Sequence, residues 1–224
     1  MTNIQKGFAY YKYRWFITSN GKLVVGGKNA EQNEELIKKF IEPKHDLEYS
    51  SQISLKNYSK KEKYVVMHTR SPGSPFSIIL DENPNEKDIN ETAIFTASFS
   101  RQWKSRKKEA QVDVFLLEQI YKEKNMKVGT FGVTGKIDHR KIPLILHLKK
   151  QLNVLRAVPF KSDNSLIIIP GKIPKEKFAM QISKDYKIDI QEVLNALPTG
   201  GFDFEIAILN KPNKEYNKTS KKKK

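Results

Sequence analysis

One short segment of the 224-residue chain gathers side chains that could carry out chemistry, the sequence "MHTRSPGSPFSIIL" from Met67 to Leu80. His68 lies near two serines, the pairing of base and hydroxyl that nucleophilic catalysis uses. However, Pro-Gly-Ser-Pro is not the Gly-x-Ser-x-Gly elbow of serine hydrolases, Pro75 has no amide to offer an oxyanion hole, and no acidic partner is evident. The remaining interpretations are a turn fixed by its prolines and glycine, or a loop whose amides bind phosphate beside a cation. We favour phosphate binding, for which the candidates are Arg70, Gly73 and Ser74.

The rest of the chain offers little for catalysis or metal binding. There is no cysteine, which excludes disulfides, thiolate zinc sites and cysteine nucleophiles, and the four histidines show no ligand spacing. The glycine-containing sequence "GTFGVTGKI" has Ile137 where a P-loop needs Ser or Thr to bind magnesium. Asp113 alternates with two valines, so we expect it to face solvent or a neighbouring lysine. We predict a protein that is not an enzyme and that uses no cofactor and no metal.

The strong positive charge indicates a polyanionic partner. The formal net charge is +16, of which +6 lies in the lysine-rich residues 211–224 and +10 in the rest of the chain. Such a balance favours nucleic acid, because Lys and Arg release counterions when they neutralise phosphates. A solvated surface or an anionic membrane would also suit these charges, although no amphipathic helix with a lysine face stands out. No apolar run approaches the roughly 20 residues that span a bilayer and no signal peptide is evident, so we expect a soluble, cytoplasmic protein.

The elements that position these residues begin with a hairpin and a helix between Arg14 and Phe40. Aromatic and β-branched residues from Tyr10 to Ile17 favour a strand, Ser19-Asn20-Gly21 favours a turn, and Leu23 to Val25 favour the returning strand. Asn29 and Gln32 have the spacing of a capping box at the start of the helix. The aromatic residues alternate along the first strand, so one face belongs to the core and the other offers either more core or a platform for base stacking.

Further elements follow in the order expected of an α+β fold with a mainly antiparallel sheet and two main helices. Asp88 and Glu91 predict a helix cap, and the helix that follows is apolar around most of its surface as far as Lys107, so we expect it to be buried. The predicted strands are residues 64–69, 76–80, 112–117, 129–134 and 142–148. We assign residues 1–150 to this domain.

Residues 151–210 read as a small appended α+β unit, followed by an unstructured lysine-rich tail, 211–224. Strands are predicted at residues 154–158, 166–169 and 204–209. Two short helices, one opened by Pro174 and one capped by Asp189, form a bihelical segment. A helix-turn-helix that reads DNA is one interpretation, but the second helix carries no Lys or Arg, so a packing extension or a module for a protein partner is favoured.

Several of these segments resemble the NFACT-R family, the RNA-binding domain of NFACT proteins. The sequence "RWFITSNGKLVVGGKNAEQNEELIKKF" is similar to the opening of that domain, and "MHTRSPGSPFSIIL" to its His-x-x-x-Pro-Gly-Ser-Pro-Phe strand-loop-strand. Weaker matches are "ETAIFTASFSRQW" with "VDVFLL", and "GTFGVTGK" before "IPLIL". The matches keep the family's order across about residues 8–150, and from Gln151 the resemblance to this domain lapses.

The resemblance implies a near-standalone form of an RNA-binding domain best known inside larger proteins. Those proteins bind the large ribosomal subunit and tRNA during the rescue of stalled ribosomes, and the portion that transfers to this chain is RNA binding, not their addition of residues to the nascent chain. We predict contacts to tRNA or ribosomal RNA, made to phosphate and sugar with little base reading. The predicted contacts are Arg14, Lys28, Asn29, Asn33, His68, Arg70, Gly73, Ser74, Lys136 and Arg140. The alternatives are a protein-interaction adaptor acting through residues 151–210, and DNA binding through the bihelical segment.

Overall fold

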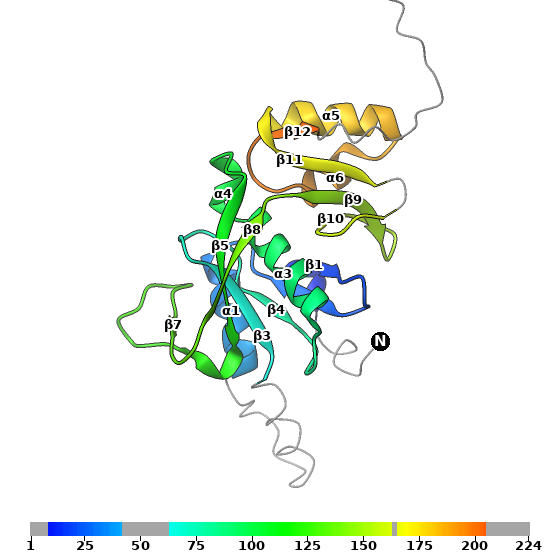
Figure 1. Ribbon diagram of the computed structural model, residues 1–224. Coiled ribbons are helices and arrows are strands. Elements are labelled where there is room, and N and C mark those ends of the chain that lie inside the picture. Colours follow the sequence, from blue (N-terminus) through cyan, green and yellow to red (C-terminus); the bar gives the residue numbers. More distant parts are fainter. Residues whose placement is uncertain (1–8, 42–62, 163–164, 205–224) are drawn as a thin grey trace, which may run out of the picture.

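The computed structural model describes residues 9–41, 63–162 and 165–204, which form an α+β structure with two main antiparallel sheets (Figure 1). The first sheet has six strands in the order β1-β2-β4-β3-β5-β8, and every neighbouring pair is antiparallel. The predicted α+β class with a mainly antiparallel sheet is therefore confirmed. The six strands are β1 (Arg14–Ile17), β2 (Leu23–Gly26), β3 (Val65–Thr69), β4 (Ser77–Ile79), β5 (Glu109–Leu116) and β8 (Asp138–Pro143).

The predicted hairpin and capped helix are present at the start of the described chain. Gly21 adopts a φ of +82°, a conformation that glycine reaches without strain, and its N–H donates to the carbonyl of Thr18. Helix α1 (Ala30–Ile41) begins after Asn29, whose Oδ1 accepts the N–H of Gln32 at 2.8 Å. The Gln32 side chain accepts the N–H of Lys28 instead of that of Asn29, so the capping box is incomplete. Residues Tyr10–Lys12, expected to begin the strand, form a 3-10 turn, η2.

The predicted buried helix is broken into two, and its cap lies three residues earlier than expected. Helix α3 (Glu86–Ser98) begins after Asn85, whose Oδ1 accepts the N–H of Asp88, while Asp88 accepts the N–H of Asn85. Asp88 is thus the third residue of the helix and not its cap. Ser100 has an extended backbone and its hydroxyl accepts the N–H of Gln102, so it ends the first helix and caps the short α4 (Arg101–Lys104).

The second sheet has the order β10-β9-β11-β12 and carries helices α5 (Lys175–Tyr186) and α6 (Ile190–Ala196). Its strands are β9 (Leu146–Gln151), β10 (Val154–Val158), β11 (Leu166–Ile173) and β12 (Phe202–Phe204). The single strand predicted at 142–148 is wrong, because the chain turns at Leu144 and passes from the first sheet to the second. The strand predicted at 129–134 shortens to β7 (Gly132–Val133), which pairs with β6 (Ile120–Tyr121). Pro174 and Asp189 precede α5 and α6 as predicted, and Asp189 Oδ1 accepts two helix amides.

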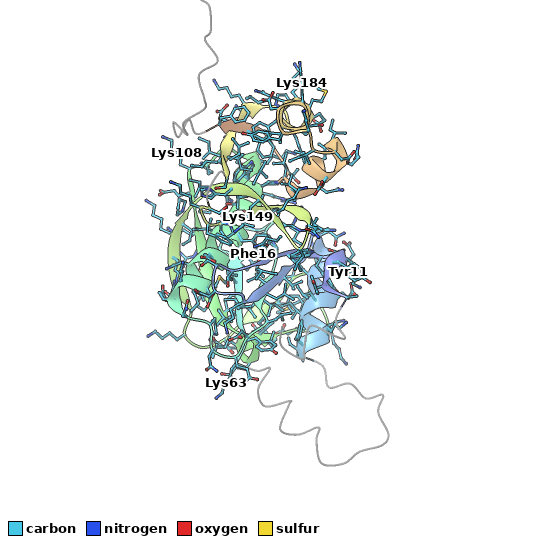
Figure 2. All side chains as sticks on the ribbon, turned by 90° about the vertical axis from the view of Figure 1, so that its right-hand side faces the viewer. Tyr11, Phe16, Lys63, Lys108, Lys149 and Lys184 are labelled. Carbon is cyan, nitrogen blue, oxygen red and sulfur yellow. The ribbon has the colours of Figure 1, made fainter. Side chains whose placement is uncertain are left out.

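Helix α3 lies between the two sheets and contributes to a core that both share (Figure 1). One continuous cluster of buried side chains joins Phe16 and Val24 of the first sheet, Phe95 of α3, and Phe178 and Phe202 of the second unit. In Figure 2 Phe16 lies in the interior whereas Tyr11 lies at the surface. The prediction that this helix is buried at the centre is confirmed. A second cluster packs α1 against the other face of the six-stranded sheet.

Polar contacts also join the second sheet to the first. The Trp103 indole N–H donates to the carbonyl of Gly201 at 3.0 Å, and the Gln151 side-chain amide bonds both the N–H and the carbonyl of Ile17. The Arg156 guanidinium lies 3.9 Å from the ring centroid of Trp15. Strand β9, with its partners in the second sheet, runs across residue 150, where the domain boundary was predicted.

Some of the sequence predictions fall on residues that lie outside the described part. These are the polar segment 42–62, residues 205–209 of the last strand and the tail 211–224. Within the described residues, no helix is long and apolar enough to cross a bilayer, and no group of three or more His, Asp and Glu side chains could hold a metal ion.

Candidate nucleic-acid interface

A cavity of about 850 Å³ lies where the start of α1, the loop of residues 70–75 and the segment 128–133 meet. Seven of the ten predicted contact residues line it, and they come from two separate segments of the chain, residues 28–33 and 68–74. Its cations are Lys28, Arg70 and Arg101, and its carboxylate is that of Asp113. The predicted residues that the fold gathers there are Lys28, Asn29, Asn33, His68, Arg70, Gly73 and Ser74.

Asn33 and Ser74 fix the shape of the loop from inside the protein. The buried Asn33 side chain donates to the carbonyl of Ser74 at 3.2 Å and accepts the N–H of Phe76 at 3.0 Å. The Ser74 hydroxyl accepts the N–H of Thr69 at 2.9 Å across the neck of the loop. A Cβ on Gly27 would lie 2.2 Å from the Asn33 Oδ1, which explains the glycine at that position. Asn33 and Ser74 therefore position the loop and present little of their own side chains to a ligand.

Gly73 brings the loop against α4. Its φ of +97° is unfavourable for residues with a Cβ, and a Cβ added there would lie 2.5 Å from the Arg101 Cδ. The carbonyl of Gly73 accepts the N–H of Arg101 at 2.8 Å. Arg101 is exposed on the rim of the cavity and was not predicted. Ser100, a residue type typical of helix caps, is the sequence signal that could have placed Arg101 in a new helix outside the buried one.

His68 lies on the wall of the cavity as a neutral ring. It stacks on Phe76 with ring centroids 4.4 Å apart, and burial lowers its pKa, an effect that the neighbouring Asp113 opposes. Asp113, expected to face solvent or a lysine, instead lies with Oδ1 2.6 Å from the Nδ1 of His139 and 3.9 Å from the Nε of Arg70. Cross-strand pairing places His68, Asp113 and His139 side by side on β3, β5 and β8. Near neutral pH, His68 supplies a surface for contact but no charge.

The fold does not bring Lys136 and Arg140 into this cavity. Lys136 is exposed in the turn before β8, and its carbonyl accepts from the Gln119 amide. Arg140 bonds Glu86 and Asp138, so it ties β8 to the start of α3, and the hydrogen bond with Glu86 raises its pKa. The charge of Arg140 is thus already compensated within the protein. Lys136 stays exposed at the surface beside Ile137, which lines the cavity, although Lys136 itself does not.

The aromatic residues of β1 do not form an exposed platform. Tyr13, Trp15 and Phe16 are buried, because the strand is covered by the α3 core on one face and the α1 core on the other. Tyr11 is 72% exposed and remains the one candidate for base stacking among the described aromatics of this segment. Arg14, the remaining predicted contact, lies half-buried beside the Phe99 ring. It lines a second, smaller cavity, which Lys28 also borders.

These features define a basic α+β module with a cation-lined cavity beside a rigid Pro-Gly-Ser-Pro loop. Residues 12–135 match the family model described as the NFACT protein RNA binding domain, and the chain belongs to that family. The predicted resemblance to NFACT-R is confirmed.

Several ribosome quality control proteins are similar to parts of this chain. The archaeal Rqc2 homolog aRqcH of Methanocaldococcus jannaschii is 30% identical over 215 residues, covering 86% of this chain and 28% of its own length. Ribosome quality control complex subunit 2 of Schizosaccharomyces pombe is 43% identical over 58 residues, 24% of this chain and 6% of its own. The human ribosome quality control complex subunit NEMF is 39% identical over 46 residues, 19% and 4% of the two chains.

The chain thus spans little more than a quarter of the length of the archaeal relative. The family model ends at residue 135, whereas the archaeal alignment covers enough of the chain to include residues beyond 150. Among solved structures, the C-terminal part of the fibronectin/fibrinogen-binding protein from Streptococcus suis gives a TM-score of 0.46 at 17% identity, covering 58% of this chain and 45% of that chain.

Proposed function

We propose that the chain is a non-catalytic RNA-binding protein that contacts tRNA or ribosomal RNA through the cavity beside the Pro72–Pro75 loop. The observation that carries this proposal is the convergence of Lys28, Arg70 and Arg101 on one cavity, in a chain whose family is an RNA-binding domain. Its relatives are named as ribosome quality control factors, so we place this activity in ribosome quality control, with the large ribosomal subunit as its platform.

The arrangement suits recognition of the phosphate backbone. Lys28 and Arg101 are exposed and Arg70 keeps 58% of its side chain in solvent, so all three can reach phosphate oxygens. The side chains of Asn33 and Ser74 bond main-chain groups of the loop and hold it in one conformation. The loop therefore loses little conformational entropy when an RNA strand binds. With His68 neutral and Asn33 engaged, few side chains remain to read base edges. The module should therefore recognise charge and shape more than sequence.

The salt dependence of RNA binding tests this site. We expect the double substitution Arg70→Gln and Arg101→Gln to weaken binding of a structured RNA such as tRNA, and to lower the slope of log affinity against log salt by about 1 for each phosphate that is no longer neutralised. Lys184→Gln is the matched control, because Lys184 is an exposed cation of α5 that lines neither this cavity nor the smaller one. Fluorescence anisotropy at several salt concentrations measures both quantities.

Two results would contradict the proposal. The first is an unchanged slope in the Arg70 and Arg101 double variant, and the second is an equal loss in Lys184→Gln, which would mean that only the net charge matters. The ribosomal assignment has its own test: crosslinking in cells should enrich tRNA and large-subunit ribosomal RNA above the background of another protein of equal charge.

The structure gives the DNA-binding alternative no support. Helix α6 packs Val193 and Ala196 into the core, contacts β10, and uses its Glu192 side chain to accept the N–H of Leu155. It carries no Lys or Arg that could meet phosphate or guanine in a major groove. A protein partner for residues 151–210 remains a separate proposal, which a pull-down with the full chain would test.

A further inference from the structure

A second cavity, of about 440 Å³, lies at the junction of the two sheets, and it shares Lys28 and Phe99 with the site proposed above. The first unit contributes β1, η2 and the residues before α1, and the second contributes β10 and residues of α5 and α6. Its volume is within the range of small-ligand sites. Four cations line it, two from each unit, namely Arg14, Lys28, Arg156 and Lys175.

The protein around these cations offsets their charge only in part, through Glu192 near Arg156 and Glu176 near Lys175. Among the described residues, no carboxylate forms an ion pair with any of the four. Glu192 is the single described carboxylate on the cavity wall, and its Oε1 already accepts the N–H of Leu155 at 2.7 Å. The cavity therefore carries a local excess of positive charge.

Each of the two arginines lies against an aromatic ring, and within the described residues neither guanidinium donates a hydrogen bond to the protein. The Arg14 guanidinium lies 4.6 Å from the centroid of Phe99, and that of Arg156 lies 3.9 Å from Trp15. The Nε of Arg156 is buried and forms no hydrogen bond within the described part of the chain. Stacking fixes the plane of a guanidinium while its N–H groups stay free for an oxyanion. Lys175 donates one bond to the carbonyl of Leu197 at 3.1 Å, which leaves two of its three protons.

Holding these charges together is costly, and an anion would remove the cost. Burial lowers the pKa of Arg14 to about 10, and burial followed by repulsion from Arg14 lowers the pKa values of Lys28 and Lys175. Burial disfavours the charged forms of these groups, so holding them together in the folded chain has an energetic cost. An anion that binds among them would therefore stabilise the fold as well as gain affinity.

We propose that this cavity is a second RNA-contact site, in which Arg14, Lys28, Arg156 and Lys175 bind one phosphate group of a nucleotide. Two planar guanidinium groups favour phosphate, whose oxygens accept paired N–H donors. Tyr11, also on the wall and largely exposed, offers a ring on which the base of the same nucleotide stacks. This inference rests on the proposed RNA binding, and it adds that the second unit supplies half of the site.

Because the chain has six arginines, NMR of their Nε–H groups in the full-length protein tests the proposal directly. We expect inorganic phosphate to shift the Arg14 and Arg156 signals along a saturable curve, and adenosine 5′-monophosphate to saturate them at lower concentration. Parallel, non-saturating shifts of all six signals would indicate an ionic-strength effect and would overturn the proposal, as would equal binding of adenosine without its phosphate.

RNA affinity provides the second readout. We expect Arg156→Gln with Lys175→Gln to weaken RNA binding about tenfold or more, because two charge-assisted bonds to the phosphate are lost, whereas Lys184→Gln should not. RNAs with and without a 5′-phosphate then separate a terminal phosphate from a backbone phosphate as the ligand. If RNA binding depends on Arg70 and Arg101 but phosphate does not shift the Arg14 and Arg156 signals, the second site is wrong while the proposed function holds. If phosphate saturates the two signals but no RNA binds, the proposed function fails instead.

Discussion

Asn33 illustrates how a polar side chain of helix α1 can shape a loop of the candidate site from inside the protein. Its amide bonds the carbonyl of Ser74 and the N–H of Phe76, so its role is to hold the loop in one conformation. A buried amide that satisfies two main-chain groups is costly to remove, because both partners would be left unpaired. The residues around the cavity thus divide into those that shape it and those, chiefly Lys28, Arg70 and Arg101, that remain for a ligand.

His68 provides a prediction about pH at the same scale. Burial lowers its pKa below the ordinary value of 6.5, so the unfolded chain binds the proton more readily than the folded one. Stability should therefore fall as the pH drops from 6.5 toward the lowered pKa, and should not change through His68 above that window. We expect His68→Phe, which keeps a ring to stack on Phe76, to reduce this slope.

Urea unfolding at a series of pH values measures the effect. A smaller slope should remain in the variant, because burial and Lys161 also lower the pKa of His147. An identical pH dependence of stability in wild type and His68→Phe would contradict the prediction, because it would mean that His68 has the same pKa in the folded and the unfolded chain.

At the residue scale, the sequence identified most members of the first cavity but not their roles. Motif order was enough to select Lys28, Gly73 and Ser74, since these positions are close in the chain to recognisable turns and caps. It could not show that Arg140 is bound by Glu86 and Asp138, or that Asp113 meets His139, because those contacts depend on strand pairing between distant segments. Arg101 was missed for the same reason, as its neighbour Gly73 is 28 positions away.

Among the elements, helix α3 depends on its first turn. Asn85 caps the helix, and Asp88 returns a bond to the Asn85 N–H while also accepting the hydroxyl of Thr18 at 2.6 Å. We expect Asn85→Ala to lower the free energy of unfolding by about 1 kcal/mol. Chemical denaturation measures this, and Asn83→Ala, an exposed residue two positions earlier, is the matched control. Equal effects of the two substitutions would contradict the assignment of the cap.

Element boundaries were the least predictable part of the fold. The sequence placed a continuous helix to Lys107 because its apolar pattern continues through Phe99 and Trp103. Ser100 breaks the helix through local bonds that leave the apolar pattern unchanged, since its hydroxyl donates to the carbonyl of Ala97 and accepts the N–H of Gln102. Likewise, the apolar run 142–148 looks like one strand, because both of its halves are buried in the shared core. Periodicity reports burial, and it does not report which sheet buries a residue.

For the molecule as a whole, the shared core predicts that the two sheets unfold together. Phe202 in the second sheet contacts the rings of Trp103 and Phe178, and all three belong to the cluster that contains Phe16. We expect Phe202→Ala to destabilise the entire chain by roughly 3–5 kcal/mol. Scanning calorimetry should show one transition at a lower temperature, with equal calorimetric and van't Hoff enthalpies. Two resolved transitions, with one left at the wild-type temperature, would mean that the sheets are independent.

The bond pattern between Gln151 and Ile17 has a consequence for any attempt to isolate the RNA-binding domain. Strand β1 is the outermost strand of its sheet, and the Gln151 amide occupies main-chain groups that would otherwise be open to another chain. An unprotected edge strand is a template for aggregation. A fragment ending at residue 150 loses this cover and exposes the apolar surface on which β12 packs, including the ring of Trp103. Such a fragment should self-associate, and any shortened chain would have to supply its own edge protection to remain monomeric.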